Sequence, residues 1–252
     1  MTGPTSEPRE AYRIAEAGFG ASAEAFDRGR PDYPGAVGRW LAERLALRPG
    51  VRVADLAAGT GKLTRVLAGT GAWVVAIEPV PAMREALSRS LPGIPVVAGL
   101  AESMPFASSS LDVVTVGQAF HWFDGLKALA EIERVLRPGG ALALVWNRRP
   151  IERSALHQQL TEIMAPYRDD APAHASGKWR EAFAGRELQE WTHDFVQRLD
   201  ADGLADRVGS TSFIAALDDP ERERVLAQVR AIAGEGEVEV PYECEIHVWR
   251  PT

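Results

Sequence analysis

The chain has little cysteine and no long apolar run. Cys244 is the single cysteine among 252 residues, so an internal disulfide is impossible and a cysteine-based metal site is not expected. No apolar stretch approaches the roughly 20 residues that a helix needs to span a bilayer. The first residues also lack the basic start and apolar stretch of a secretory signal. We therefore expect a cytoplasmic protein without a membrane partner.

The chain also lacks an excess of positive charge. It has 28 Lys and Arg against 35 Asp and Glu, which gives a formal net charge of −7. The basic residues are scattered and often adjoin acids, as in Glu221–Arg224. A nucleic-acid binder usually carries a basic stripe that displaces counterions from phosphates, so we expect no nucleic-acid partner. The five histidines are far apart in sequence, and we expect no metal site.

The sequence does contain a regular alternation of short apolar stretches and helical patterns. Together they predict an α/β fold, with a doubly wound, mostly parallel sheet covered by helices on both faces. Strands are predicted at 51–56, 73–78, 95–100, 111–118 and 141–146, helices at 35–47, 62–68, 82–91 and 126–136, and a turn at 137–140. Two later alternating stretches, 191–199 and 237–250, extend this to a seven-stranded sheet with an antiparallel C-terminal strand.

A glycine loop, Asp55–Gly61, follows the first predicted strand. Its glycines let the backbone approach a ligand, and the helix that follows offers unpaired N–H groups. A phosphate-binding Walker loop would need Gly at Leu56 and Ser or Thr at Leu63, and a dinucleotide fingerprint would need Gly at Thr64. The loop fits neither pattern. An ordinary strand-to-helix turn remains the alternative for this segment taken alone.

Further segments with chemical signals follow the later strands in order. Glu78 closes the second strand, where a carboxylate can accept both hydroxyls of a ribose. Val97–Phe106 follows the third strand, and Val116–Asp124 covers the end of the fourth. Ligands of open α/β sheets lie beyond the carboxyl ends of the strands, so these segments are expected to meet at one edge. Glu133–Leu144 supplies a helix, a Pro-Gly-Gly turn and the fifth strand.

Taken together, residues 51 to 146 resemble class I S-adenosylmethionine-dependent methyltransferases, in particular the type 11 methyltransferase domain. Phe26–Pro34 is similar to the entry segment of the trans-aconitate methyltransferase type. Ala57 stands where the family has Gly, and Leu100 stands where many members have Asp. We expect Ala57 to hold the turn only with a negative φ. The resemblance implies a Rossmann-like fold and an enzyme that uses S-adenosyl-L-methionine and releases S-adenosyl-L-homocysteine.

The resemblance also implies roles for single residues. Arg30 would pair with the methionine carboxylate, Glu78 would hold the ribose, and Glu102 would face the adenine. His121 would accept a proton from the acceptor as the catalytic residue, or would only wall the pocket. The implied cofactor-binding residues are Arg30, Ala57, Ala58, Gly59, Thr60, Gly61, Glu78, Pro79, Met83, Ala101, Glu102, Gln118, Ala119, Phe120 and Trp122, and the implied substrate-binding residues are Tyr33, His121, Trp146 and Trp179.

On this interpretation the chain has four segments. Residues 1–35 form an N-terminal lid with a flexible start followed by a short helix, and residues 36–147 form the cofactor-binding core. Residues 148–190 form a helical insertion that caps the substrate, and residues 191–252 complete the sheet. We expect one domain, present as a monomer or a homodimer.

The implied partner is a small-molecule methyl acceptor, a metabolite or natural product methylated on oxygen or carbon, with a carboxylate as one possibility. No Asn-Pro-Pro-Tyr type motif lies near the fourth strand, which counts against N-methylation of adenine or glutamine. The alternative is a protein that binds the cofactor without transferring its methyl group, as a cyclase-like catalyst or a regulatory subunit. The presence of Glu78, Gly59 and Gly61 argues for transfer.

Overall fold

The computed structural model describes residues 27–168 and 174–251, which form two compact units. We call the first the sheet unit; its described residues are 32–146, 174–193 and 244–251. The second, the helical unit, comprises the described residues 27–31, 147–168 and 194–243. The segment expected to form a cap, 148–190, is thus divided between the two units. The short helix predicted near the amino terminus lies outside the described residues.

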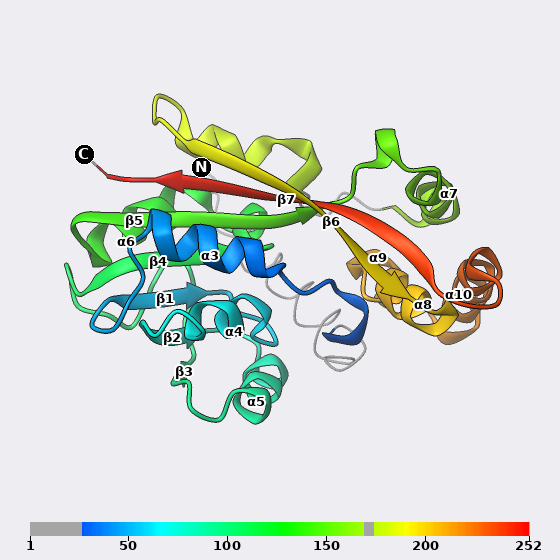
Figure 1. The fold of residues 1–252 in the computed structure, drawn as a ribbon, viewed down its shortest axis with the longest axis horizontal. Helices are drawn as coiled ribbons and strands as arrows, with labels where there is room; N and C mark the ends of the chain where they lie inside the picture. The colour runs from blue at the N-terminus through cyan, green and yellow to red at the C-terminus, as the bar shows by residue number, and fades with distance from the viewer. Residues whose placement is uncertain (1–26, 169–173, 252) are drawn as a thin grey trace, which may run out of the picture. The chain divides into compact units, whose positions relative to one another are not determined.

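Seven strands form one sheet in the order β3-β2-β1-β4-β5-β7-β6 (Figure 1). The first five strands pair in parallel and the C-terminal strands are antiparallel, which confirms the predicted doubly wound, mostly parallel sheet. The strands are β1 (Arg52–Leu56), β2 (Trp73–Ile77), β3 (Val96–Val97), β4 (Leu111–Gly117), β5 (Leu136–Arg148), β6 (Gln189–Leu199) and β7 (Val238–Trp249). The last three have residues in both units.

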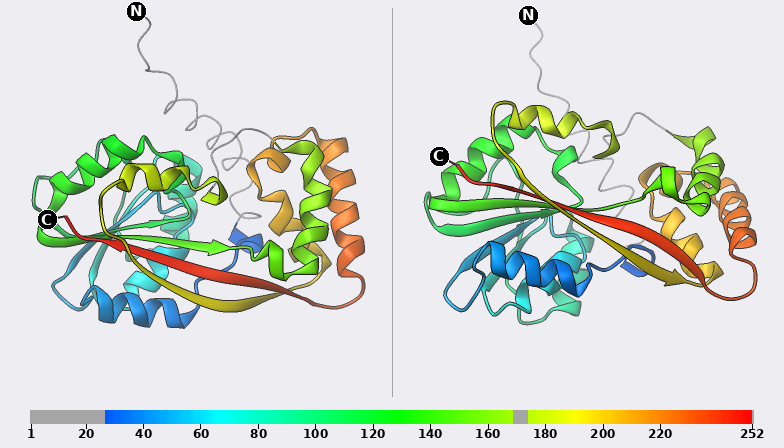
Figure 2. Two further views of the ribbon diagram at one scale, coloured as in Figure 1. Left: turned by 90° about the horizontal axis from the view of Figure 1, so that it is seen from above. Right: turned by 45° about the horizontal axis from the view of Figure 1, so that its top comes forward.

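Helices cover both faces of the sheet unit, with α3 and α6 on opposite sides of its strands (Figure 2). Local signals fix where helices begin: Asp124 accepts a hydrogen bond from Lys127 N at the start of α6, and Pro81 opens α5. The sheet unit holds α3 (Gly35–Arg44), α4 (Lys62–Ala68), α5 (Pro81–Ser90), η1 (Phe120–Trp122), α6 (Gly125–Val135), η4 (His174–Ser176) and η5 (Lys178–Phe183). The helical unit holds η2 (Ile151–Arg153), α7 (Ala155–Met164), η3 (Ala165–Tyr167), α8 (Ala201–Gly209), α9 (Ser212–Ala215) and α10 (Asp219–Ala233).

Two strand boundaries differ from the sequence prediction. The predicted strand 95–100 is reduced to Val96–Val97, since the chain turns back after it and Ser103 N donates to Leu100 O at 3.2 Å. β5 begins at Leu136 and runs through the predicted turn at 137–140. A register shift against β4 absorbs these residues, and Gly139 takes a φ of +78°. The turn prediction was therefore wrong, because the Pro-Gly-Gly segment forms a bulge in the strand.

Each unit has its own apolar core. In the sheet unit, α6 packs Leu129 and Ile132 against strand residues such as Leu56 and Val116, all at most 1% exposed. The core of the helical unit joins α7, α8, α10 and β7 around Leu160, Leu204, Val225, Val229 and Tyr242. Among the helices that the structure describes, none is long and apolar enough to cross a membrane.

Asp55 is a carboxylate buried completely within the sheet unit. Thr64 Oγ1 of α4 donates to it at 2.6 Å and Thr115 Oγ1 of β4 donates at 2.8 Å. The carboxylate therefore joins β1 to the neighbouring strand and to the helix that follows the glycine loop. Burial raises the pKa of Asp55 from 3.8 to about 6, against the two hydroxyl hydrogen bonds that lower it.

The raised pKa of Asp55 predicts a pH-dependent loss of stability. Between about pH 4 and pH 6 the unfolded chain ionises Asp55 while the folded chain keeps it protonated, so the free energy of unfolding falls as pH rises. The shift corresponds to about 3 kcal/mol. Urea unfolding from pH 4 to pH 7 should show this fall in the wild-type chain and a smaller one in Asp55→Asn.

The matched control is Asp202→Asn, because this side chain is 83% exposed. Its unfolding free energy should follow the wild-type pH profile. Parallel profiles for the wild type and Asp55→Asn would contradict the assignment.

Candidate functional site

The carboxyl ends of four parallel strands meet at one edge of the sheet unit. Leu56 pairs with Ile77 of β2 and with Val116 of β4, and Ile77 pairs with Val97 of β3. The loops that follow these strands therefore start side by side. The strand order reverses between β1 and β4, and ligands of open α/β sheets bind outside the carboxyl ends at this point.

Glu78 holds the glycine loop at this edge. Its Oε2 accepts from Gly59 N at 2.8 Å and its Oε1 accepts from Val80 N at 2.9 Å. The side chain is 5% exposed, and burial raises the pKa of its carboxyl above the usual range although both N–H donors lower it. A carboxylate has about four lone-pair positions, so acceptor capacity remains on both oxygens.

The two glycines of the loop have different physical reasons to be glycine. Gly61 has a φ of +92°, and a Cβ there would meet Leu87 Cγ at 2.9 Å and Leu91 Cδ1 at 3.1 Å. Gly61 is therefore required by the packing of α4 against α5. Gly59 has a φ of +57°, but a Cβ there would meet no atom within 4 Å. Beside the Glu78 carboxylate the loop therefore borders open space, as a ligand cradle must.

Two residues without glycine's freedom adopt left-handed backbone at the ends of the central strands. Ala57, directly after β1, has a φ of +54°, and Gln118, directly after β4, has a φ of +62°. The expectation that Ala57 keeps a negative φ is therefore wrong. Its backbone lies in the left-handed region that glycine adopts readily. The Cβ of Ala57 makes this conformation strained. Such strain is found at functional sites, where the surroundings hold it in place.

The loops after β3 and β4 are joined by a side chain. Glu102 Oε1 accepts from Asp124 N at 2.9 Å, and Asp124 in turn caps α6. Leu100, where many family members carry an acid, is 48% exposed. Glu102 therefore fixes the spacing of two loops at the predicted adenine side.

Tyr33 lies over the end of β4. It is 9% exposed, and a Cβ at Gly117 would meet its hydroxyl oxygen at 2.8 Å and Leu63 Cδ2 at 3.2 Å. Gly117 therefore leaves the room that Tyr33 occupies beside the start of α4. The structure thus brings this predicted substrate residue to the same edge as the glycine loop.

The segment after β4 divides into core and candidate site residues. Phe120 is 1% exposed and packs against Phe123 and Phe183 at ring distances of 5.5 and 5.2 Å, so its side chain belongs to the core. His121 and Trp122 are partly buried, with ring centroids 5.6 Å apart. Among the remaining predicted cofactor residues, the side chains of Thr60, Met83 and Ala101 are buried, and those of Ala58, Pro79 and Ala119 are partly buried.

Trp146 and Trp179, predicted to bind the substrate, are 1% and 6% exposed. Their rings lie 4.6 Å apart, and the Trp146 Nε1 donor has no hydrogen-bond partner among the described residues.

Beside these tryptophans His174 Nε2 and His247 Nε2 lie 3.4 and 3.7 Å from Glu245 Oε2. Two imidazoles and a carboxylate are a donor set that zinc accepts. The fold brings together histidines that are far apart in the sequence, so sequence spacing held no signal for this cluster.

Arg30 lies in the helical unit. Its Nε donates to Ser210 Oγ at 3.0 Å and its Nη2 donates to Ser210 O at 2.8 Å. The pairing of Arg30 with a methionine carboxylate stays a prediction.

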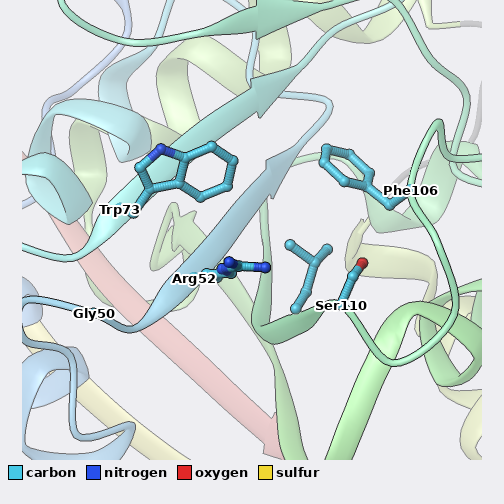
Figure 3. A pocket seen from close by; sticks show the side chains of 6 residues that line it. Gly50, Arg52, Trp73, Phe106 and Ser110 are labelled. Atoms are coloured by element: carbon cyan, nitrogen blue, oxygen red, sulfur yellow. The ribbon is translucent and has the colours of Figure 1, made fainter.

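An open hollow of about 620 Å³ lies at the opposite ends of the strands (Figure 3). Arg52 and Trp73 begin β1 and β2, and Phe106 faces Trp73 across the space. Because ligands of parallel sheets bind at the carboxyl ends, the hollow at the amino ends is not assigned to the candidate site.

Comparison with known proteins decides the family. A methyltransferase domain family matches residues 54–144, the stretch that contains the glycine loop, Glu78 and β4. An uncharacterized methyltransferase of Mycobacterium tuberculosis is 39% identical over 233 residues, which cover 89% of this chain and 91% of the relative. The chain belongs to the methyltransferase family. The prediction that the protein is an enzyme of this family is confirmed.

Solved structures share the fold of this methyltransferase. A proposed type II methyltransferase from Anaeromyxobacter dehalogenans superposes with a TM-score of 0.65 at 27% identity, covering 87% of this chain and 96% of that one. A geranyl diphosphate methyltransferase in complex with SAM superposes with a TM-score of 0.50 at 17% identity, covering 86% of this chain and 85% of that one. The second likeness concerns the fold alone.

The left-handed Ala57 predicts that glycine improves this position. Ala57→Gly should raise the free energy of unfolding of the methyltransferase by about 1 kcal/mol, because it removes the contact between Cβ and carbonyl oxygen at positive φ. Urea unfolding of the purified chain measures the change.

The neighbouring variant Ala58→Gly is the matched control, since Ala58 is not among the described residues with positive φ. It should lose roughly 0.5–1 kcal/mol through the greater freedom of the unfolded chain. Equal losses in both variants would contradict the strain at Ala57.

Proposed function

We propose that the methyltransferase binds S-adenosylmethionine at the carboxyl ends of β1 to β4 and transfers its methyl group to oxygen or carbon of a small molecule. The observation that carries the proposal is the open space at Gly59 beside the buried Glu78 carboxylate. A backbone without a Cβ and a carboxylate with unused lone pairs suit a nucleoside with two ribose hydroxyls. The methyl donor supplies an electrophilic sulfonium, and its product is S-adenosylhomocysteine.

The residues of the chain then bind and orient. Glu78 accepts hydrogen bonds from the ribose hydroxyls while it holds Gly59 and Val80 in place. Ala101 and Glu102 border the adenine, and the loop from Gln118 to Trp122 lies beside the methionine part. Methyl transfer is an in-line displacement, so holding donor and acceptor in line supplies much of the rate.

His121 is proposed to accept the proton of an acceptor hydroxyl. It lies in η1, directly after the β4 end of the site, and an imidazole is a common general base in enzymes. Tyr33, over the same strand end, is the best placed of the predicted substrate residues. The buried Trp146 and Trp179 would contact the acceptor only through surfaces that their own packing leaves open.

The glycine geometry predicts separate effects on binding and folding. Gly59→Asn should keep the loop, because asparagine tolerates left-handed backbone, yet fill the space beside Glu78. Calorimetry should show donor affinity lowered roughly tenfold or more, with unfolding changed by less than about 1 kcal/mol. Gly61→Ala should instead cost about 1–3 kcal/mol of stability, because its Cβ meets Leu87. Full donor affinity in Gly59→Asn would contradict the proposal that the methyl donor occupies the space at Gly59.

The function itself is tested by transfer of tritium from labelled S-adenosylmethionine to a panel of acids and phenols. Glu78→Gln should lower donor affinity roughly tenfold or more, since an amide group cannot accept all the hydrogen bonds of a carboxylate. The exposed Glu85 on the adjoining α5 provides the control Glu85→Gln, which should bind and transfer as the wild type does.

The outcomes of this experiment separate the alternatives. A chain with no donor affinity in calorimetry would overturn the proposal. Tight donor binding without a methylated product over the whole panel would favour the cyclase-like or regulatory alternative.

A further inference from the structure

The helical unit buries an arginine that no acid neutralises. Arg207 on α8 is 7% exposed, and its Nε donates to Tyr242 Oη at 2.7 Å. Its guanidinium carbon lies 5.9 Å from the centre of the Tyr242 ring. Among the described residues no carboxylate forms an ion pair with it. Buried charges in proteins are ordinarily paired, so a buried guanidinium held by a neutral hydroxyl leaves positive charge available.

A second arginine faces the same place. Arg149 follows β5, and its guanidinium makes no hydrogen bond and no ion pair with any residue that the structure describes. Burial, together with the charges of Arg207 and Arg168, lowers the pKa of Arg149 to about 10, with Tyr242 opposing them. Arg207 and Arg168 thus lie close enough to Arg149 for their positive charges to repel its own in the absence of an anion.

The neighbouring histidine adds no negative charge. His157 Nε2 lies 2.7 Å from Pro241 O, so Nε2 carries the proton and donates, and Nδ1 is an acceptor without a hydrogen-bond partner in the described part of the chain. Burial, with Arg149 and Arg207 beside it, lowers the pKa of His157, which favours the neutral ring. The ring packs against Tyr242 at 5.8 Å.

The acids of the helical unit that form ion pairs are engaged with other arginines. Glu243 binds Arg148 at 2.6 Å and Arg153 at 2.7 Å, and Asp206 binds Arg28 at 2.9 Å. Glu243 and Asp206 therefore do not neutralise the positive charge of Arg149 and Arg207.

We propose that Arg149 and Arg207 bind an oxyanion group, a carboxylate or a phosphate, of a small anionic ligand. The planar guanidinium presents N–H donors in a fork that matches both groups, and two such forks give charge-assisted hydrogen bonds. The anion site stands on the helical unit alone and does not depend on the proposed methyl transfer.

The test is calorimetric titration of the full chain with citrate and with inorganic phosphate, at low ionic strength and without a methyl donor. We expect saturable binding of at least one anion and none of trimethyl citrate, which lacks the charge. Tighter binding of citrate identifies a carboxylate as the bound group, and tighter binding of phosphate identifies a phosphate ester. Arg149→Gln and Arg207→Lys should each weaken the binding roughly tenfold or more.

The control is Arg198→Gln in the same unit, because Arg198 is 67% exposed and pairs with Glu239. It should bind the anions as the wild type does. Arg149→Gln should also unfold at a higher urea concentration than the wild type at low salt, because a repelling charge is removed. A residue with only a structural role would lower that concentration.

Absence of saturable anion binding, or equal binding in Arg149→Gln and the wild type, would overturn the proposed site. Because the titration contains no methyl donor, its outcome bears on the anion site alone, and the tritium transfer experiment bears on the proposed function alone.

Discussion

Two hydrogen bonds to the Glu78 carboxylate hold together the edge on which the candidate site depends. One comes from Gly59 N in the loop after β1 and the other from Val80 N at the start of α5. Because Leu56 and Ile77 are paired neighbours in the sheet, a single side chain can fix both loops. The same carboxylate borders the open space at Gly59. The side chain that fixes the two loops is therefore also the one proposed to bind the ribose hydroxyls of the methyl donor.

Both units bury charge, but with opposite sign. In the sheet unit Asp55 accepts hydrogen bonds from hydroxyls, and Glu78 accepts them from backbone N–H groups. The charge of Glu78 also raises the pKa of Asp55. In the helical unit Arg207 is buried and Arg149 is partly buried, and neither forms an ion pair with an acid among the described residues. Such groups cost stability and are retained where they serve binding. In the proposed account, the sheet unit offers acceptors to the hydroxyls of a methyl donor and the helical unit offers donors to an anion.

The core of the fold was predictable because it rests on local pattern. The helix 62–68 matches α4, and the strands before and after it are predicted within a residue of β1 and β2. The left-handed backbone of Ala57 was not predictable from the sequence. A sequence pattern counts the missing glycine as a departure and cannot show that the folded chain holds alanine at positive φ. The bulge at 137–140 was missed for a similar reason, because its pairing with β4 is a non-local contact.

The groups of the helical unit had no sequence signal at all. Arg149 and Arg207 are separated by α7 and β6, and nothing in their spacing marks them as a pair.

The central claim, that the methyl donor lies against Glu78 and Gly59, is tested most directly by a crystal structure with S-adenosylhomocysteine bound. The account predicts the ribose hydroxyls within hydrogen-bond distance of the Glu78 carboxylate. A ligand seated instead in the hollow beside Arg52 and Trp73 would contradict it.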